Sequence, residues 1–129
     1  MGGMSRLPDQ PSLSVRIADD GEPTVIRVEG ELDSFTAAQL REGFGRAMQV
    51  PTAEGAPATV VDIREVPFVD SAGLGALVGG IRRLRQAGGH VALCCTRPSV
   101  LRLLNMTGFD RIVTVTSSPE EARQVLSPA

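Results

Sequence analysis

The chain has 129 residues, 42% of them hydrophobic, and a formal net charge of -2. This length fits one domain that buries roughly two thirds of its unfolded surface, and the acidic balance argues against a nucleic-acid surface, which needs a clustered basic face. No apolar run is long enough to span a bilayer and none resembles a signal peptide, so we expect a cytoplasmic protein without a membrane partner.

The first predicted elements form a β-hairpin. Residues 1–11, with two prolines and two glycines, are predicted to be a flexible leader. Apolar and small or polar side chains then alternate over 13–18, which is typical of a strand with one buried face. The turn signal at 19–21 leads into a second strand at 25–28, so the two strands should pair.

The first helix is predicted from apolar side chains that recur near helical spacing. These are Phe35, Leu40, Phe44, Ala47 and Met48. Asp33 or Ser34 would cap this helix. A loop rich in Pro, Gly and Ala follows at 51–57, and a buried strand is predicted at 59–63.

The second helix should begin near Ser71 and end at Gly88-Gly89. Its apolar positions are Leu74, Leu77, Val78, Ile81 and Leu84. The rest of the chain is predicted as a strand at 90–95, a helix from Pro98 to Gly108, a short strand at 112–115 and a helix capped by Ser118. The predicted order is β-β-α-β-α-β-α-β-α, an α/β fold with a mixed, mostly parallel sheet of about five strands and about four helices.

Three residue types that often carry chemistry are given structural roles here. The adjacent Cys94 and Cys95 lack metal-ligand spacing and could pair only through a strained ring, so we predict reduced packing residues. His90 is the sole histidine and heads a strand, where a structural role is expected. We therefore predict no metal and no cofactor.

Ser71 is the most informative residue, because an apolar strand-like segment delivers its hydroxyl to the start of a helix. The free N–H groups and the positive end of the helix dipole favour an anion there, such as a phosphate carried on Ser71. A second interpretation is that Asp70 or Ser71 is simply the helix cap. The residues alone leave both open.

Three motifs in order carry a resemblance to a known family. They are Gly30-Glu31-Leu32-Asp33, Val69-Asp70-Ser71-Ala72-Gly73-Leu74-Gly75, and the Pro98 to Phe109 segment that ends in Leu104-Asn105-Met106-Thr107-Gly108-Phe109. Over about residues 12–126 the chain resembles the bacterial anti-sigma factor antagonists of the STAS superfamily. The resemblance implies a single STAS domain at 12–127 after the leader.

The resemblance also implies a partner-switching regulator of transcription, of the kind used in stress response and sporulation, with no catalysis of its own. Its unphosphorylated form would bind an anti-sigma factor that is also a serine/threonine kinase, and so release a sigma factor. The kinase would phosphorylate Ser71, which blocks binding, and a serine phosphatase would restore the free hydroxyl. Ala72 leaves Ser71 as the one candidate hydroxyl in its loop.

The partner-binding residues that the resemblance implies lie in two loops. They are Asp33, Ser34, Thr36, Asp70, Ser71, Ala72, Gly73, Leu74 and Gly75. Each has a structural alternative: Asp70 as a helix cap, the two glycines as close packing of the first turn, and capping for two of the three early residues. An exposed basic stripe is predicted at Arg82, Arg83 and Arg85, and Phe109 is predicted to be core.

Other functions fit less well. A hydrolase nucleophile at Ser71 would lack the G-x-S-x-G elbow and has only His90 as a base. The main alternative is a STAS accessory or scaffold subunit that is not phosphorylated, such as a stressosome-like, lipid-transport or transporter-associated module.

Overall fold

The computed structural model describes residues 12–18, 23–49 and 58–126. Its strands are β1 (Leu13–Ala18), β2 (Thr24–Gly30), β3 (Ala58–Glu65), β4 (His90–Cys94) and β5 (Thr114–Thr116). Its helices are α1 (Ala37–Met48), α2 (Ser71–Gln86), α3 (Pro98–Met106) and α4 (Pro119–Leu126), with the short 3-10 helix η2 (Phe109–Arg111) before β5. The predicted order of strands and α-helices is confirmed.

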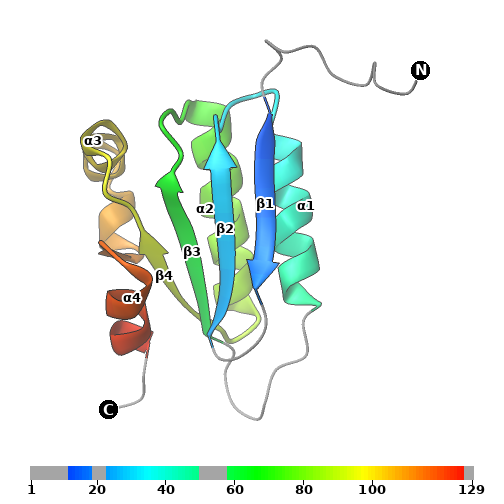
Figure 1. The fold of residues 1–129 in the computed structure, drawn as a ribbon, viewed down its shortest axis with the longest axis vertical. Coiled ribbons are helices and arrows are strands. Elements are labelled where there is room, and N and C mark those ends of the chain that lie inside the picture. The colour runs from blue at the N-terminus through cyan, green and yellow to red at the C-terminus, as the bar shows by residue number, and fades with distance from the viewer. Residues whose placement is uncertain (1–11, 19–22, 50–57, 127–129) are drawn as a thin grey trace.

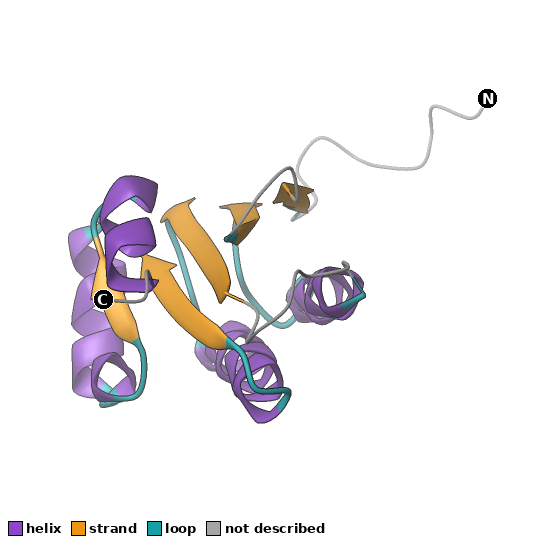
Figure 2. Cartoon of the chain, turned by 90° about the horizontal axis from the view of Figure 1, so that it is seen from below, coloured by secondary structure: helices purple, strands orange, loops and turns teal. Residues whose placement is uncertain are grey.

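The five strands form one sheet in the order β1-β2-β3-β4-β5 (Figure 1). β1 runs antiparallel to β2, and each later pair is parallel, so the predicted hairpin and mixed sheet are confirmed. Helices α1 and α2 cover one face and α4 covers the other (Figure 2). The carboxyl ends of β2, β3 and β4 therefore meet at one edge, from which the chain enters α1, α2 and α3.

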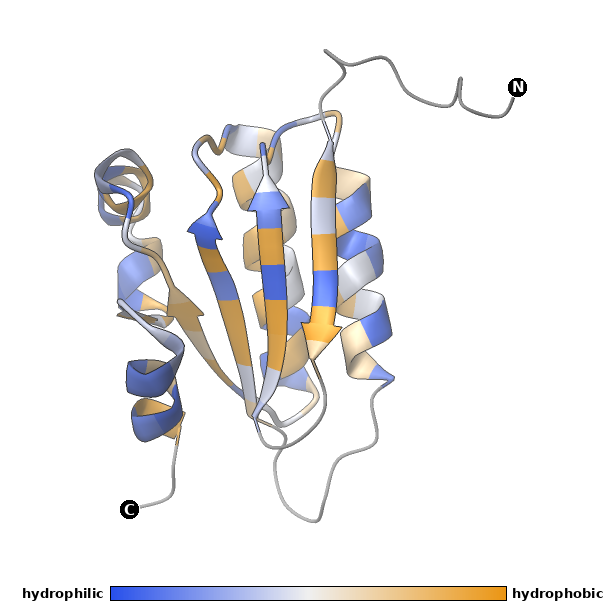
Figure 3. Cartoon of the chain, viewed as in Figure 1, coloured by the Kyte–Doolittle hydropathy of each residue, from blue (hydrophilic) through white to orange (hydrophobic). Residues whose placement is uncertain are grey.

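The core has two parts, one on each face of the sheet. The larger part joins α1 and α2 to the sheet and includes Ile26, Phe44, Val61, Leu77 and Ile81. The smaller part lies under α4 and consists of Val25, Val60, Ala92, Cys94 and Ala122. Successive residues of β3 thus serve opposite faces, as the pleat of a strand requires, and Figure 3 shows the apolar bands along the sheet.

The predicted helix ends are confirmed where short-range hydrogen bonds set them. Asp70 caps α2 by accepting the Gly73 N–H at 2.9 Å. After α2, Gly88 adopts the left-handed backbone (φ 91°), and the N–H groups of Gly88 and Gly89 donate to carbonyls of the last turn. Ser118 caps α4 through its hydroxyl oxygen.

Two predicted elements begin later than expected, since α1 excludes Phe35 and β5 excludes Ile112. Phe35 precedes α1, which begins only at Ala37, and its side chain is exposed, as is that of Met48 at the end of the helix. Ile112 is also exposed, because the chain leaves η2 there and only Val113 turns into the core before β5. Apolar identity alone thus places the start of an element too early, where the chain changes direction.

Three predicted segments lie outside the residues that the structure describes. The predicted leader at 1–11, the turn at 19–21 and the loop at 51–57 lie outside the described residues. Within the described residues, no helix combines the length and the apolar character needed to cross a membrane. In the same ranges no group of three or more His, Cys, Asp or Glu side chains is arranged to hold a metal ion.

Candidate functional site

Backbone hydrogen bonds join the segment after β2 to the segment before α2. The Leu32 N–H donates to the Phe68 carbonyl at 3.0 Å, and the Asp70 N–H donates to the Leu32 carbonyl at 3.1 Å. Leu32 and Val69 form an isolated parallel bridge, and Leu32 is fully buried. Two of the three motifs found in the sequence are therefore held side by side at the carboxyl edge of the sheet.

Ser71 is the first residue of α2 and is exposed. Its position at the helix N-terminus places its hydroxyl beside the positive end of the helix dipole. Asp70, the N-cap, has its side chain committed to the Gly73 N–H, so its structural role is confirmed. The start of α2 thus presents one serine hydroxyl to solvent on a backbone that a cap holds in place.

The loop before α1 is organised by Asp33 and Thr36. One Asp33 carboxylate oxygen accepts the N–H groups of Phe35 and Thr36 at 2.9 and 3.1 Å. The Thr36 hydroxyl donates to the Glu31 carbonyl at 2.8 Å and accepts the Asp33 N–H at 3.0 Å. The predicted capping of α1 by Asp33 or Ser34 is therefore wrong, because Asp33 stabilises the preceding turn and Thr36 occupies the cap position without a side-chain cap bond.

The predicted partner-binding residues come together but differ in accessibility. Ser34, Ser71 and Gly75 are exposed, while Asp33, Asp70, Ala72 and Leu74 are partly buried. Thr36 is fully buried and Gly73 is buried as well. The structure therefore corrects the prediction for these last two residues, which support the surface from inside and are not accessible to a partner.

The two glycines of the α2 segment have different surroundings. A Cβ added at Gly73 would overlap the carbonyl group of Leu32, so this position requires glycine for close packing. A Cβ added at Gly75 would meet no atom within 4 Å. Packing therefore accounts for Gly73 and does not account for Gly75.

Sequence reasoning missed two exposed aromatic side chains at this site. Phe35 is 79% exposed and Phe68 is 52% exposed, and they lie on the two joined segments. A signal for Phe35 was present, since it falls outside the i, i+4, i+7 spacing of Leu40, Phe44 and Ala47. Phe68 carried no such signal, because its segment is uniformly apolar.

The site is acidic before any modification. Residues 31–36 and 66–75 contain three carboxylates, Glu31, Asp33 and Asp70, and no Arg, Lys or His, which gives a formal charge of -3. Both Asp33 and Asp70 accept backbone N–H groups, which offsets part of their charge locally. A phosphate on Ser71 would add charge of the same sign to this surface.

Basic side chains lie next to the site, not within it. Arg97, which precedes α3, donates from Nε to the Arg64 carbonyl at 3.3 Å and has Nη2 4.0 Å from a Glu65 carboxylate oxygen. The predicted stripe on α2 is exposed, but its third member is held, since Arg85 donates to the Ile112 carbonyl. Arg85 of this stripe thus connects α2 to the segment before β5.

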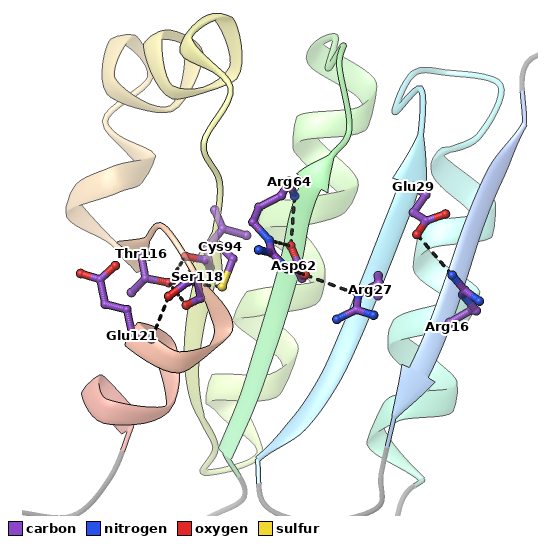
Figure 4. Close-up of polar contacts among 10 residues, drawn as sticks. Arg16, Arg27, Glu29, Asp62, Arg64, Cys94, Thr116, Ser118 and Glu121 are labelled. Carbon is purple, nitrogen blue, oxygen red and sulfur yellow. Dashed lines mark hydrogen bonds and ion pairs between the residues drawn. The ribbon is translucent and has the colours of Figure 1, made fainter.

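An ion-pair network centred on Asp62 joins side chains of β2 and β3 (Figure 4). Asp62 is 3% exposed and accepts Arg64 Nε and Nη2 at 2.9 Å each, with Arg27 Nε 3.5 Å away. Burial by itself raises the pKa of Asp62, but the Arg64 hydrogen bonds and the two arginine charges outweigh it, so the pKa lies below its usual value. The network keeps a charged carboxylate in the middle of the sheet.

The two cysteines are free and buried, as predicted. Cys94 lies in β4 with its sulfur 3.3 Å from the Thr116 hydroxyl oxygen. Burial raises the pKa of both the Cys94 and the Cys95 thiol. Neither thiol is close to the reactive thiolate state, so they add no chemistry to the site. His90 is exposed at the head of β4.

Comparison with known proteins agrees with this geometry. The sequence model of the STAS domain family matches residues 14–122. The chain is 34% identical to the anti-sigma F factor antagonist of Paenibacillus polymyxa over 91 residues, which cover 70% of this chain and 75% of that protein. It is 32% identical over 114 residues to the anti-sigma-F factor antagonist RsfB of Mycobacterium tuberculosis, covering 86% and 87%.

A solved structure shows the same fold. It is the crystal structure of an anti-sigma factor antagonist from Mycobacterium paratuberculosis, with a TM-score of 0.76 and 27% sequence identity. The match covers 93% of this chain and 97% of that one. The strand order and the helix positions that create the site are therefore shared with a solved protein of this kind.

Proposed function

This chain belongs to the STAS domain family, and we propose that it acts as an anti-sigma factor antagonist in a cytoplasmic partner-switching pathway. Its unphosphorylated form binds an anti-sigma factor that is also a serine kinase, and the sigma factor is thereby released. The chain has no catalytic role and needs no cofactor, and residues 12–127 act as one domain. The names of its relatives support the partner class.

The observation that carries this proposal is the exposed hydroxyl of Ser71 at the first turn of α2. In the proposed step the Ser71 oxygen attacks the terminal phosphorus of ATP, the bond from that phosphorus to ADP breaks, and the hydroxyl proton is lost. A serine phosphatase reverses the modification with water and releases inorganic phosphate. Both reactions require the hydroxyl to be accessible, as it is here.

The proposed contact surface consists of accessible residues from the two joined segments. They are Asp33, Ser34, Asp70, Ser71, Ala72, Leu74 and Gly75. Thr36 and Gly73 serve as supports, since one holds the turn at Asp33 and the other lets α2 approach Leu32. The joined backbones make the surface rigid, so a partner would find it already in its binding shape.

Electrostatics explain how a phosphate would block binding. Phosphorylation adds roughly -1.5 to -2 charge, which the N-terminus of α2 can accommodate while the surface is hydrated. A partner that covers the surface must desolvate that charge, and one unfavourable charge pair at about 4 Å costs about 4 kcal/mol at an effective dielectric near 20. Half of that cost already exceeds a tenfold loss of affinity.

Pull-down of serine-kinase anti-sigma factors from the same genome tests the proposal. Wild-type protein and Ser71→Ala should bind, and Ser71→Glu should not. With ATP, mass spectrometry should find phosphate on Ser71 of the wild type and none on Ser99, an exposed serine in the first turn of α3 that serves as the matched control. If no such kinase binds and Ser71 stays unmodified, the antagonist function is excluded and the accessory or scaffold function takes its place.

A further inference from the structure

The four phenylalanines of the chain divide into two groups. Phe44 and Phe109 are buried in the core, at 0% and 2% exposure. Phe35 and Phe68 are exposed, and both lie at the site that contains Ser71. Single exposed apolar residues are common on folded proteins, but two large aromatic side chains exposed on hydrogen-bonded neighbouring segments call for an explanation.

The structure holds Phe35 outward. Its N–H donates to the Asp33 carboxylate at 2.9 Å, which fixes the turn on one side. The next two residues, Thr36 and Ala37, are buried at 0% and 2% exposure, which fixes the chain on the other side. A side chain between these two anchoring points has no route into the core, so its exposure is a property of the fold and not of a loose loop.

Phe68 is held in the same way by its partner strand segment. Its carbonyl accepts the Leu32 N–H at 3.0 Å, and Leu32 itself is fully buried. Phe68 follows Pro67, whose ring fixes the φ angle of Pro67 and so restricts the backbone that leads into Phe68. Ser71 comes three residues later, so one rigid unit carries both phenylalanines and the hydroxyl. Figure 1 shows the loops before α1 and α2 next to each other at the top of the sheet.

We propose that Phe35 and Phe68 are the apolar anchors of the docking surface and insert into apolar depressions on the anti-sigma factor. This inference rests on the proposed function and adds which residues supply the binding energy. Binding energy at protein interfaces is concentrated in a few buried, mostly aromatic or arginine side chains, and the site has no arginine. Preformed aromatic side chains also lose little conformational entropy when they bind.

The same arrangement would make the proposed switch more sensitive to a phosphate on Ser71. Aromatic anchors on the Ser71 segment and on the segment joined to it would exclude water from the hydroxyl in the complex. A phosphate in a water-free contact loses its hydration, whereas a phosphate in a wet interface keeps it. With these anchors in place, the charge of a phosphate on Ser71 would be enough to prevent formation of the complex.

Isothermal titration with the kinase identified by pull-down tests the inference. Phe35→Ala and Phe68→Ala should each weaken binding by about tenfold or more. Met106→Ala, which removes a side chain 75% exposed on α3, is the matched control and should stay within about twofold. Thermal unfolding of each variant checks that it is folded. If Phe68→Ala is unfolded, Phe68→Leu is used in its place. Phe68→Leu should still weaken binding of the kinase several-fold.

The possible outcomes distinguish the role of the two phenylalanines from the proposed antagonist function. If wild type binds, Ser71→Glu does not, and both folded phenylalanine variants bind within about twofold of wild type, the anchors are excluded and the proposed function stands. If wild type binds no anti-sigma factor, both are excluded. Weakening by the phenylalanine variants but not by Met106→Ala supports the inference.

Discussion

Gly73 of α2 lies directly against the carbonyl group of Leu32, so closely that a Cβ at position 73 would overlap it. The same carbonyl accepts the Asp70 N–H at 3.1 Å. One buried residue after β2 therefore sets the position of the first turn of α2. Because Ser71 lies between these two contacts, its location depends on a segment that is distant in the sequence.

This relationship predicts opposite effects for two glycine substitutions. Gly73→Ala should destabilise the protein by about 1–3 kcal/mol, because its new methyl group meets backbone that cannot move aside cheaply. Gly75→Ala should stabilise it by up to about 1 kcal/mol, because alanine favours a helix and the site is open. Urea unfolding of the two variants measures both.

The same two substitutions test whether Gly75 has a role in binding a partner. If a partner backbone approaches this turn, Gly75→Ala will weaken binding of the anti-sigma factor while the free energy of unfolding rises. Equal destabilisation by both substitutions would contradict the described packing of α2.

Two substitutions of Asp70 distinguish its role as a helix cap from the role of its negative charge. Asp70→Ala should cost about 1 kcal/mol of stability, because the Gly73 N–H loses its acceptor. Asp70→Asn should keep most of that stability, since asparagine is also a good N-cap. If the partner recognises the charge, Asp70→Asn will fold normally and bind more weakly in titration calorimetry. A large loss of stability in Asp70→Asn would contradict the role assigned to the cap.

The Asp62 network predicts a dependence of stability on pH. The pKa of Asp62 is lower in the folded protein than its ordinary value, so its contribution is present above about pH 4 and is lost as the pH falls through the folded value. Asp62→Asn should therefore lower the free energy of unfolding at pH 7 by about 1–3 kcal/mol. Urea unfolding should show this difference shrinking at pH 3, and a difference that is the same at both values would argue against the ion pairs.

The thiols should report on unfolding. Cys94 and Cys95 are buried, and burial raises the pKa of each, so an alkylating reagent at pH 8 should react slowly with the native protein. Reaction with two thiols per chain is expected once urea unfolds it. Complete labelling of the native protein within minutes would show that β4 opens easily.

Local features were predictable from the sequence because they depend on residues close together in the chain. The order of elements follows from apolar periodicity, and both ends of α2 and the start of α4 follow from caps at Asp70, Gly88 and Ser118 that bond within a few residues. Ser71 could be placed at a helix start for the same reason.

Tertiary structure alone decided which residues of the site are accessible. Thr36 is buried because its hydroxyl bridges Glu31 and Asp33, and Phe35 is exposed because the turn next to it is held by those bonds. Gly73 differs from Gly75 only because Leu32 lies against one of them. The burial of Thr36 and the close approach at Gly73 depend on contacts that the fold creates, and apart from the spacing that sets Phe35 outside the α1 stripe, no local pattern in the sequence carries that information.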